Sequence, residues 1–434
     1  MKKNTKDSIV IGFALFSMFF GAGNLIFPGF LGNELGSSFF IGMIGFILTG
    51  VGLPLLAIIA CSKGDGSFES IAAKIGPKFV VIFTSILFIA IGPLLAVPRT
   101  AAITFEMSIQ PLLPSMSNKT FALVSILAIA LYFSINLYFV LKKSSIVDTI
   151  GKLLTPALIL LLTLIIVKGI FMPIGTVVDT EVSNVLSISL LDGYQTMDAL
   201  AALLFAAIIT TSLKDKGYKK EDMPSMILKS SLVAAIGLAF IYGGLMFIGA
   251  QTSSIEACSS LDQPALLAFM AKSILGSTGP VIIGIAVGLA CLSTSIGLVT
   301  AGANFFEKIT KGKLSYKLNA IVISIISFAI ALLGVKTIVA FSGTVLELLY
   351  PVSITIIITT LLSKYIKNVK AIRYGVYTSL FLSIMQILPG IDTSFLPLSS
   401  VGFAWVLPTI LAVLIGSLKL NSNRENNSNE ELAY

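Results

Sequence analysis

The sequence predicts an all-α integral membrane protein, and three properties of the chain support that fold class. Of its 434 residues, 56% are hydrophobic and only 12% are charged, whereas a soluble domain carries about 25% charged residues. The mean hydropathy is +0.98. Apolar runs of roughly 20 residues, the length of a membrane-crossing helix, recur along the whole chain. We therefore interpret residues 1–434 as one polytopic transmembrane domain.

Twelve apolar runs are long enough to be interpreted as transmembrane helices. They cover residues 8–32, 36–61, 79–108, 119–141, 147–170, 188–212, 226–251, 279–306, 318–335, 337–362, 373–390 and 397–418. The first run follows three lysines, as the apolar part of a signal peptide does. It is too long for a signal peptide and lacks a small-residue cleavage site, so we expect a retained helix.

The placement of lysine predicts the orientation of the chain. Basic residues gather before the first span and in every second loop, and such segments remain in the cytoplasm. They are Lys2, Lys3 and Lys6, then Lys63, Lys74 and Lys78, Lys142 and Lys143, Lys214, Lys216, Lys219 and Lys220, Lys308, Lys311, Lys313 and Lys317, and Lys364, Lys367 and Lys370. Both termini are therefore expected to be cytoplasmic. Residues 421–434 are polar, and we expect a disordered cytoplasmic tail there.

Several function classes lack the residues that they need. The chain contains no histidine, which excludes Ser-His-Asp catalysis and the HExxH zinc motif. Cys61, Cys258 and Cys291 are too far apart for a CxxC metal motif, and no GxxxxGK[ST] loop for ATP is present. The net charge of +8 is spread over alternate loops. We therefore expect no enzyme activity, no cofactor and no nucleic-acid partner.

The first span contains a break in its helix-forming sequence. Gly21-Ala22-Gly23-Asn24 and Phe27-Pro28 place weak helix formers near the middle of the membrane. Unpaired backbone groups are costly in hydrocarbon, so unwound chain there must face a protein-lined cavity or a solute. The half-helix ends would offer N–H groups to an anion and carbonyl groups to a cation. Alternatively, the small residues serve only close helix packing.

The sixth span has its own interruption, at residues 192–198. If the first five spans (residues 8–170) form one repeat, the next repeat (residues 188–362) starts from the opposite face, because five is odd. The first and sixth spans then correspond. Interruptions at corresponding positions are the best sequence indication of a transporter's central site. We predict a five-plus-five inverted repeat with broken helices one and six, and two peripheral helices in residues 373–418.

Polar residues at membrane depth add to this pattern. Asp198 lies on the order of 12 Å below the outer face at the helical rise, where a carboxylate needs a partner or a cation. It would hold a coupling ion or a substrate amine, or it would cap the inner half-helix. Ser293-Thr294-Ser295 of the eighth span offers hydroxyl oxygens that suit Na⁺. Alternatively, these hydroxyls bond back to their own helix.

Two charged residues in the outer halves of their spans predict a gate. Arg99 lies in the third span and Glu347 in the tenth, and we hypothesise that they form an ion pair at the outer entrance. The alternative is a pair between Arg99 and Glu106, two turns along the same helix.

With these residues in view, the chain resembles the branched-chain amino acid:cation symporter family of the BrnQ type. The distinctive stretches are FSMFFGAGNLIFP at residues 16–28, GPLLAVPRT at residues 92–100, and Gly193-Tyr194 with Thr196-Met197-Asp198. The resemblance covers nearly all twelve spans. The family is similar to the larger group with the inverted-repeat fold of the bacterial leucine transporter. It implies uptake of leucine, isoleucine and valine across the bacterial cytoplasmic membrane, coupled to Na⁺ or H⁺.

The resemblance also implies site residues. A Na⁺ site would be formed by the carbonyls near Ser17 and Phe20 with Ala290, Ser293 and Thr294, and Ser295 is a register alternative. The substrate carboxylate would meet N–H groups around Ala22 and Gly23, next to Gly21, and its ammonium would meet carbonyls near Phe20 and Tyr194, with Asp198. Asn24 and Thr196 match positions of a second, substrate-linked Na⁺ site, and with Met197 they would complete the substrate-binding segments. The side chain would rest on Val97, Leu200 and Ile296. A passive channel or an amino acid sensor on the same fold is the alternative.

Overall fold

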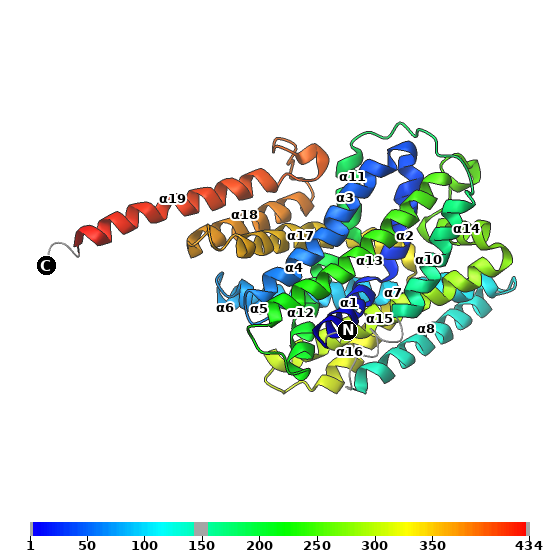
Figure 1. Cartoon of the computed structure of the whole chain (residues 1–434), viewed down its shortest axis with the longest axis horizontal. Helices are drawn as coiled ribbons and strands as arrows, with labels where there is room; N and C mark the ends of the chain where they lie inside the picture. The colour runs from blue at the N-terminus through cyan, green and yellow to red at the C-terminus, as the bar shows by residue number, and fades with distance from the viewer. Residues whose placement is uncertain (1–2, 143–154, 431–434) are drawn as a thin grey trace.

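The computed structural model describes residues 3–142 and 155–430, which form helices, turns and loops and no β-strand. Long helices pack against one another in a single bundle, and α19 (Val406–Glu430) projects from its edge (Figure 1). α19 packs on α18 (Val369–Ile387), which packs on α17 (Val335–Leu361). For these residues the predicted all-α class is confirmed.

The predicted spans fall on helices across most of their lengths. The remaining helices of these spans are α1 (Lys3–Phe19), α2 (Ala22–Leu35), α3 (Phe39–Ile47), α4 (Leu53–Ser62), α6 (Pro77–Ile89), α7 (Val97–Thr104), α8 (Asn118–Leu141), α10 (Thr155–Phe171), α11 (Val185–Gln195), α12 (Asp198–Asp215), α13 (Met223–Gln251), α15 (Gly279–Ile309) and α16 (Tyr316–Ala331). Two short helices lie in loops: α5 (Phe68–Ala72) and α14 (Gln263–Leu275). The start of the fifth span, residues 147–154, lies outside the described residues.

By length and apolarity, seven helical stretches in the described residues are able to cross a membrane. They are Ala22–Ser62, Pro77–Leu112, Asn118–Leu141, Val185–Asp215, Met223–Gln251, Gln263–Ile309 and Val335–Leu361, and shorter apolar helices cover Thr155–Phe171, Tyr316–Ala331 and Val406–Leu418. The stretch Ala22–Ser62 contains parts of two predicted spans, because a short 3₁₀ turn (Gly36–Ser38) joins α2 to α3. The count of twelve and the inverted repeat stay predictions.

The C-terminal part of the chain differs from the prediction in two places. The twelfth span is expected from residue 397, but α19 begins at Val406. Leu398 and Gly402 both have left-handed backbone, with φ of 65° and 80°, and a right-handed helix cannot pass through them. α19 also remains helical to Glu430, where a disordered tail is expected, since extending an existing helix costs little. Residues 431–434 lie outside the described residues.

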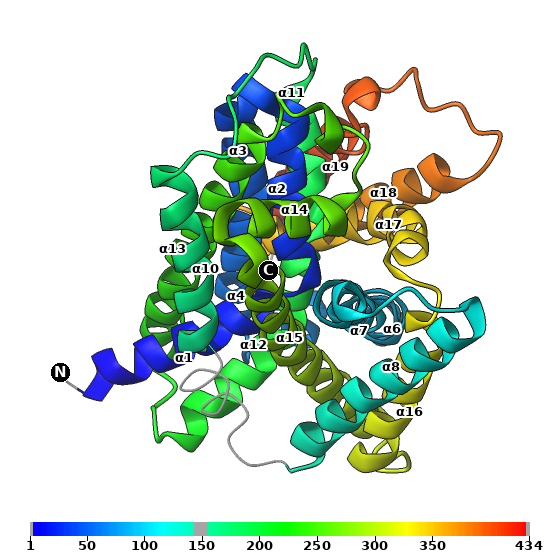
Figure 2. The ribbon, with the colours of Figure 1, turned by 90° about the vertical axis from the view of Figure 1, so that its right-hand side faces the viewer.

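The first and sixth spans are both broken. The first break is shorter than the Gly21–Asn24 segment, since α1 ends at Phe19 and α2 begins at Ala22. The second separates α11 from α12 at Thr196-Met197. α1 and α2 both pack on α13, α2 also packs on α11, and α12 packs on α4 and α15. The two breaks therefore lie inside the bundle, whereas α8 and α16 lie side by side at its edge (Figure 2).

The third span is not a regular α-helix along its whole length. A π-helical turn (Ala90–Ala96) joins α6 to α7, and it contains Pro93, which has no N–H for a regular helical hydrogen bond. π-helical turns often occur at functional sites. This turn orients α7, which carries Arg99.

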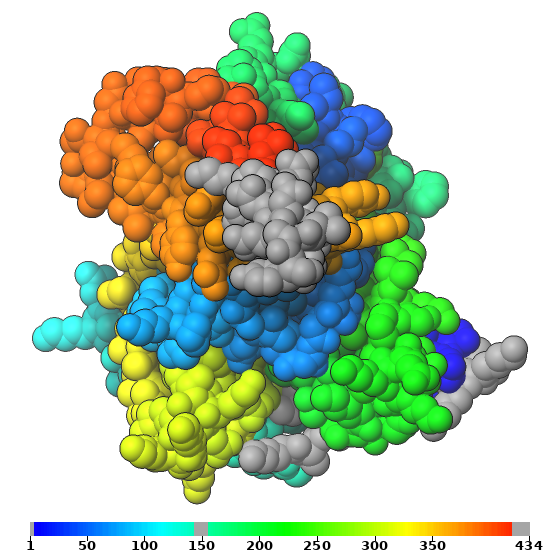
Figure 3. Space-filling model, turned by 90° about the vertical axis from the view of Figure 1, so that its left-hand side faces the viewer, coloured from blue at the N-terminus to red at the C-terminus, as the bar shows by residue number. Residues whose placement is uncertain are grey.

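The loop after α4 is fastened to the C-terminal helices. Lys63 Nζ donates to the carbonyl oxygen of Leu361 at 2.7 Å, and Arg373 Nε donates to that of Lys74 at 3.1 Å. In the space-filling view the C-terminal segments, in orange and red, lie above the blue surface of the second and third spans (Figure 3). α17 and α18 are thus joined to this face of the bundle.

Candidate functional site

The two helix breaks meet at a buried hydrogen-bonded group. Asn24 Nδ2 donates to Asp198 Oδ2 at 2.6 Å, and the Tyr242 hydroxyl donates to the same oxygen at 2.8 Å. Asn24 and Tyr242 are also within hydrogen-bonding distance of each other. All three side chains are buried, with at most 1% exposed. The group joins the first turns of α2 and α12 to the middle of α13.

Local sequence explains how each break presents its polar residues. Gly21 is extended, and its N–H donates to Asn24 Oδ1 at 3.0 Å, which caps the start of α2. Met197 has left-handed backbone, with φ of 65°, and Asp198 follows it as the first residue of α12. A negative charge is favourable at that helix end. The Asp198 carboxylate nevertheless faces Asn24 and Tyr242, so the N-cap alternative is wrong: Met197 occupies the N-cap position.

A small cavity lies beside this group. Its volume is about 10 Å³, which is close to the minimum for one water molecule. Its lining residues are Phe19, Gly21, Ala22, Asn24, Ile91, Ala96, Arg99, Thr100, Thr196, Met197, Asp198, Ala201, Thr294 and Leu298. The structure thus brings together most of the predicted polar site residues, around a cavity too small to hold an amino acid.

The three predicted apolar contacts do not line this small cavity and stay predictions. Val97, Leu200 and Ile296 are buried, whereas Ala96 and Ala201, each one residue away, and Leu298, two residues after Ile296, line the cavity. Successive helical residues are about 100° apart around the axis, so a shift of one residue turns a side chain away from the cavity.

Three further predicted substrate contacts lie just outside the cavity. The Phe20 ring stacks on Phe16 and lies 6.1 Å from the Tyr242 ring, between centroids. Gly23 lies against Arg99. The Tyr194 carbonyl accepts hydrogen bonds from Met197 N at 2.9 Å and from the Tyr350 hydroxyl at 2.9 Å. The Tyr194 carbonyl thus has two donors in this state.

Arg99 is buried behind α2, with 2% of its surface exposed. A Cβ atom on Gly23 would lie 2.6 Å from Arg99 Nη2, so glycine permits this approach. The guanidinium also lies 5.7 Å from the centre of the Phe27 ring. It faces the cavity that Asp198 also lines.

Neither predicted ion pair of Arg99 is formed among the residues that the structure describes. Glu347 is exposed on α17, whereas Arg99 is buried. Glu106 Oε1 instead accepts a hydrogen bond from Val335 N at 3.0 Å. The π-helical turn Phe105–Ile109 contains Glu106 and removes the regular spacing on which the Arg99–Glu106 alternative depends.

A cluster of oxygen atoms lies between α1 and α15. Ser293 Oγ is 2.8 Å from the carbonyl oxygen of Ser17 and 2.9 Å from that of Ala290, and the Ser17 hydroxyl donates to Ser293 Oγ at 2.8 Å. Thr294 Oγ1 is 3.3 Å from the same Ser17 carbonyl oxygen. Four of the residues predicted for Na⁺ therefore converge across two helices rather than bonding only within one.

The remaining two predicted Na⁺ residues are placed differently. Phe20 lies in the break, next to Gly21, where an added Cβ would lie 3.1 Å from Thr294 Oγ1. Ser295 Oγ is buried without a hydrogen-bond partner in the described part of the chain, and it lies beside Tyr132 of α8. Ser293 and Thr294, rather than the alternative Ser295, thus face α1.

Two tyrosines at this site were not predicted from the sequence. Tyr242 contacts Asn24 and Asp198, and Tyr350 stacks on Tyr194 with centroids 4.1 Å apart. Both tyrosines are fully buried in helices that are otherwise mainly apolar. A phenol hydroxyl at that depth needs a partner, and this requirement is the signal that could have identified them.

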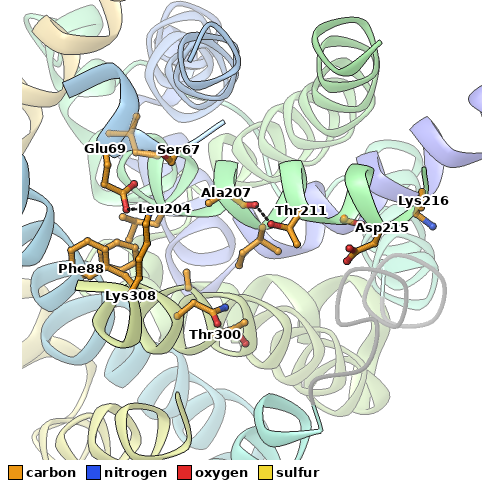
Figure 4. A pocket seen from close by; sticks show the side chains of 16 residues that line it. Ser67, Glu69, Phe88, Leu204, Ala207, Thr211, Asp215, Lys216, Thr300 and Lys308 are labelled. Atoms are coloured by element: carbon orange, nitrogen blue, oxygen red, sulfur yellow. Dashed lines mark hydrogen bonds and ion pairs between the residues drawn. The ribbon is translucent and has the colours of Figure 1, made fainter. Parts of the chain in front are cut away.

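A second, larger cavity of about 600 Å³ lies along α12 and α15 (Figure 4). Leu204, Ala207 and Thr211 line it from α12, and Thr300 and Lys308 from α15. Ala201 of the small cavity and Leu204 of the large one are about 4.5 Å apart along the helix axis.

The large cavity lies toward the face that carries the N-terminus. It extends to Asp215 at the end of α12, and nearby Tyr218 donates a hydrogen bond to Asp7 Oδ2 at 2.8 Å. At its edge, Lys308 Nζ lies 3.6 Å from Glu69 Oε1. The lysine is largely exposed, so this ion pair contributes at most about 1 kcal/mol.

Comparison with known proteins identifies the family. The family model of branched-chain amino acid transport proteins matches residues 4–422. The chain belongs to this family. It is 36% identical to the branched-chain amino acid permease BraB of Bacillus subtilis, over 95% of each chain, and 35% identical to the permease BrnQ of the same organism, over 94% of this chain and 95% of the permease. The family expected from the sequence is therefore confirmed.

The fold has a counterpart among solved structures. Mhp1, a nucleobase-cation-symport-1 family transporter in a closed conformation, superimposes with a TM-score of 0.63, over 96% of this chain and 93% of Mhp1. The sequence identity is 13%, so the likeness concerns the fold alone. This chain thus shares the fold of Mhp1.

Proposed function

We propose that this protein imports leucine, isoleucine and valine by Na⁺-coupled symport with alternating access, across the bacterial cytoplasmic membrane. The observation that carries the proposal is the meeting of two helix breaks, through Asn24 and Asp198, beside the oxygen cluster of Ser17 and Ser293. Many secondary transporters bind substrate and coupling ion together where two broken helices meet near mid-membrane. The ends of the half-helices there face the substrate and the ion.

The substrate is recognised at its polar end by the break. Asp198 offers a carboxylate to the ammonium group, and the start of α2 offers the positive end of a helix dipole to the carboxylate. The small cavity is bordered by Ile91, Ala96, Ala201 and Leu298, which suit a branched apolar side chain once the site widens. A methylene group changes binding by only about 1–3 kcal/mol in such a pocket, so all three amino acids are accepted.

Na⁺ binds in the oxygen cluster between α1 and α15. The C-terminal end of α1 adds the negative end of its dipole there. In the present arrangement hydroxyl groups donate to the Ser17 and Ala290 carbonyls. When Na⁺ enters, the hydroxyls of Ser293 and Thr294 turn their hydrogens away and offer lone pairs. Binding therefore draws α1 toward α15 and couples the ion to the adjacent substrate break.

The large cavity is the inner pathway. Its position supports release toward the face with the N-terminus, which the lysine-rich loops assign to the cytoplasm. Closure of this cavity and opening of the opposite side would give the outward-facing state.

The proposal is tested with purified protein in liposomes. We expect labelled leucine to accumulate under an inward Na⁺ gradient, to be competed by isoleucine and valine, and to stop accumulating when choline replaces Na⁺ at fixed pH. Accumulation that ignores Na⁺ but follows an inward proton gradient would reassign the coupling ion to H⁺, with Asp198 as its carrier. Leucine flux that equilibrates without accumulation would indicate a passive channel and contradict symport.

A further inference from the structure

Arg99 combines complete burial with unpaired hydrogen-bond donors. Its Nε and Nη1 atoms have no hydrogen-bond partner among residues 3–142 and 155–430, although only 2% of the residue is exposed. A buried charge without a partner is strongly unfavourable, and guanidinium groups are retained inside proteins where they meet an anion. The anion that this group serves is therefore to be sought in the space it faces.

That space is the small cavity at the helix breaks. Arg99 lines it together with Asn24 and Asp198. Its Nη2 lies against the backbone of Gly23, in the first turn of α2, and the Phe27 ring lies 5.7 Å from Cζ. The guanidinium is therefore held at the N-terminal end of a helix, where the N–H groups also favour an anion.

The neighbouring carboxylate already has other partners. Asp198 Oδ2 accepts hydrogen bonds from Asn24 and Tyr242, and no ion pair joins it to Arg99 in the described residues. One wall of the cavity thus carries a carboxylate and another a guanidinium. An amino acid zwitterion has the complementary charges, on an ammonium group and a carboxylate group that are attached to the same carbon atom.

We infer that Arg99 binds the carboxylate of the transported amino acid, while Asp198 faces its ammonium group; this inference rests on the proposed function. Each bidentate edge of the guanidinium pairs one of the unpartnered donors, Nε or Nη1, with Nη2, and two parallel N–H···O bonds from such an edge match a carboxylate. Of the N–H groups at the start of α2, that of Gly21 already donates to Asn24 Oδ1 and is not free for the substrate carboxylate. Arg99 is thus a specificity residue for α-carboxylates rather than part of an outer ion-pair gate.

The test compares leucine with leucinol, which keeps the ammonium group and the branched chain but has CH₂OH in place of the carboxylate. Equilibrium binding of both ligands to purified protein in saturating Na⁺ is measured for the wild type, Arg99→Gln and Arg99→Lys. Arg373→Gln is the matched control, because it removes an exposed guanidinium that donates to the Lys74 carbonyl, outside the site.

We expect the wild type and Arg373→Gln to bind leucine more tightly than leucinol. Arg99→Gln should weaken leucine binding at least about 30-fold, the low end for removing one partner of a buried charge pair, and should change leucinol binding less than about threefold. Arg99→Lys should fall between, since an ammonium group lacks the bidentate fork.

Two results would overturn the inference while the wild type still binds leucine. In one, Arg99→Gln keeps the wild-type preference for leucine. In the other, it weakens leucine and leucinol equally, which would make Arg99 a support for the shape of the site. If Arg99→Gln does not fold, the ratio of leucine affinity to leucinol affinity in Arg99→Lys decides between these results. A wild type that binds neither ligand would reject the proposed function, and this inference with it.

Discussion

Asn24 and Asp198 are 174 positions apart in the sequence, and a 2.6 Å hydrogen bond joins their side chains. The bond links the half-helix after the first break to the half-helix after the second. Movement of either half-helix therefore changes the geometry around Asp198.

Removal of the Asp198 charge should abolish transport. We expect Asp198→Asn to reduce leucine uptake by on the order of 100-fold, because the ammonium group loses its buried counter-charge. Uptake into liposomes under a Na⁺ gradient measures the effect. Asp192→Asn, which removes a half-buried carboxylate from α11, is the matched control and should retain uptake. Activity of Asp198→Asn within a few-fold of wild type would contradict this role.

Removal of one hydroxyl from the oxygen cluster should weaken Na⁺ dependence. Thr294→Ala is expected to raise the Na⁺ concentration for half-maximal uptake roughly tenfold, since one polar ligand is worth about 1–1.5 kcal/mol. The leucine concentration dependence at saturating Na⁺ should change less. Thr294→Ser retains the oxygen and should recover most of the affinity, whereas an unchanged Na⁺ dependence in Thr294→Ala would exclude this residue as a ligand.

Close packing between α2 and α13 should make Gly249 intolerant of a side chain. A Cβ atom there would overlap the backbone of Gly29, and overpacking of this kind costs about 1–3 kcal/mol or more. Gly249→Ala should lower the temperature at which monodisperse protein is lost on heating. Gly52→Ala is the control, because its nearest neighbour would be at 3.8 Å. Equal melting of the two variants would argue against this packing.

Cysteine labelling should map the large cavity. Ala207 is exposed in it, whereas Ala202 on the same helix is buried. A membrane-impermeant maleimide should therefore modify Ala207→Cys, from the face with the N-terminus, and leave Ala202→Cys unmodified. Background should be low, because Cys61, Cys258 and Cys291 are all buried. Modification of Ala207→Cys from the opposite face alone would reverse the assigned pathway.

The sequence predicted features that depend on local chemistry. Apolar run length predicted most of the long helices in the described residues. The glycines around Ala22 and the polar run before Ala199 located both breaks to within a few residues. Such signals are readable because backbone groups in hydrocarbon have to be satisfied within their own segment or at a protein-lined site.

Contacts between distant helices were decided by tertiary structure. Tyr242 meets Asp198, Arg99 lies against Gly23, and Ala201 rather than Leu200 faces the cavity. Each depends on helix rotation, which changes by about 100° per residue and is set by packing against neighbours. The sequence by itself therefore determined that broken membrane helices carry a polar site. Only the packed bundle decided which side chains share that site. The depth of a side chain in the membrane follows from its position along the helix, whereas the direction in which it points is set by how the helices pack.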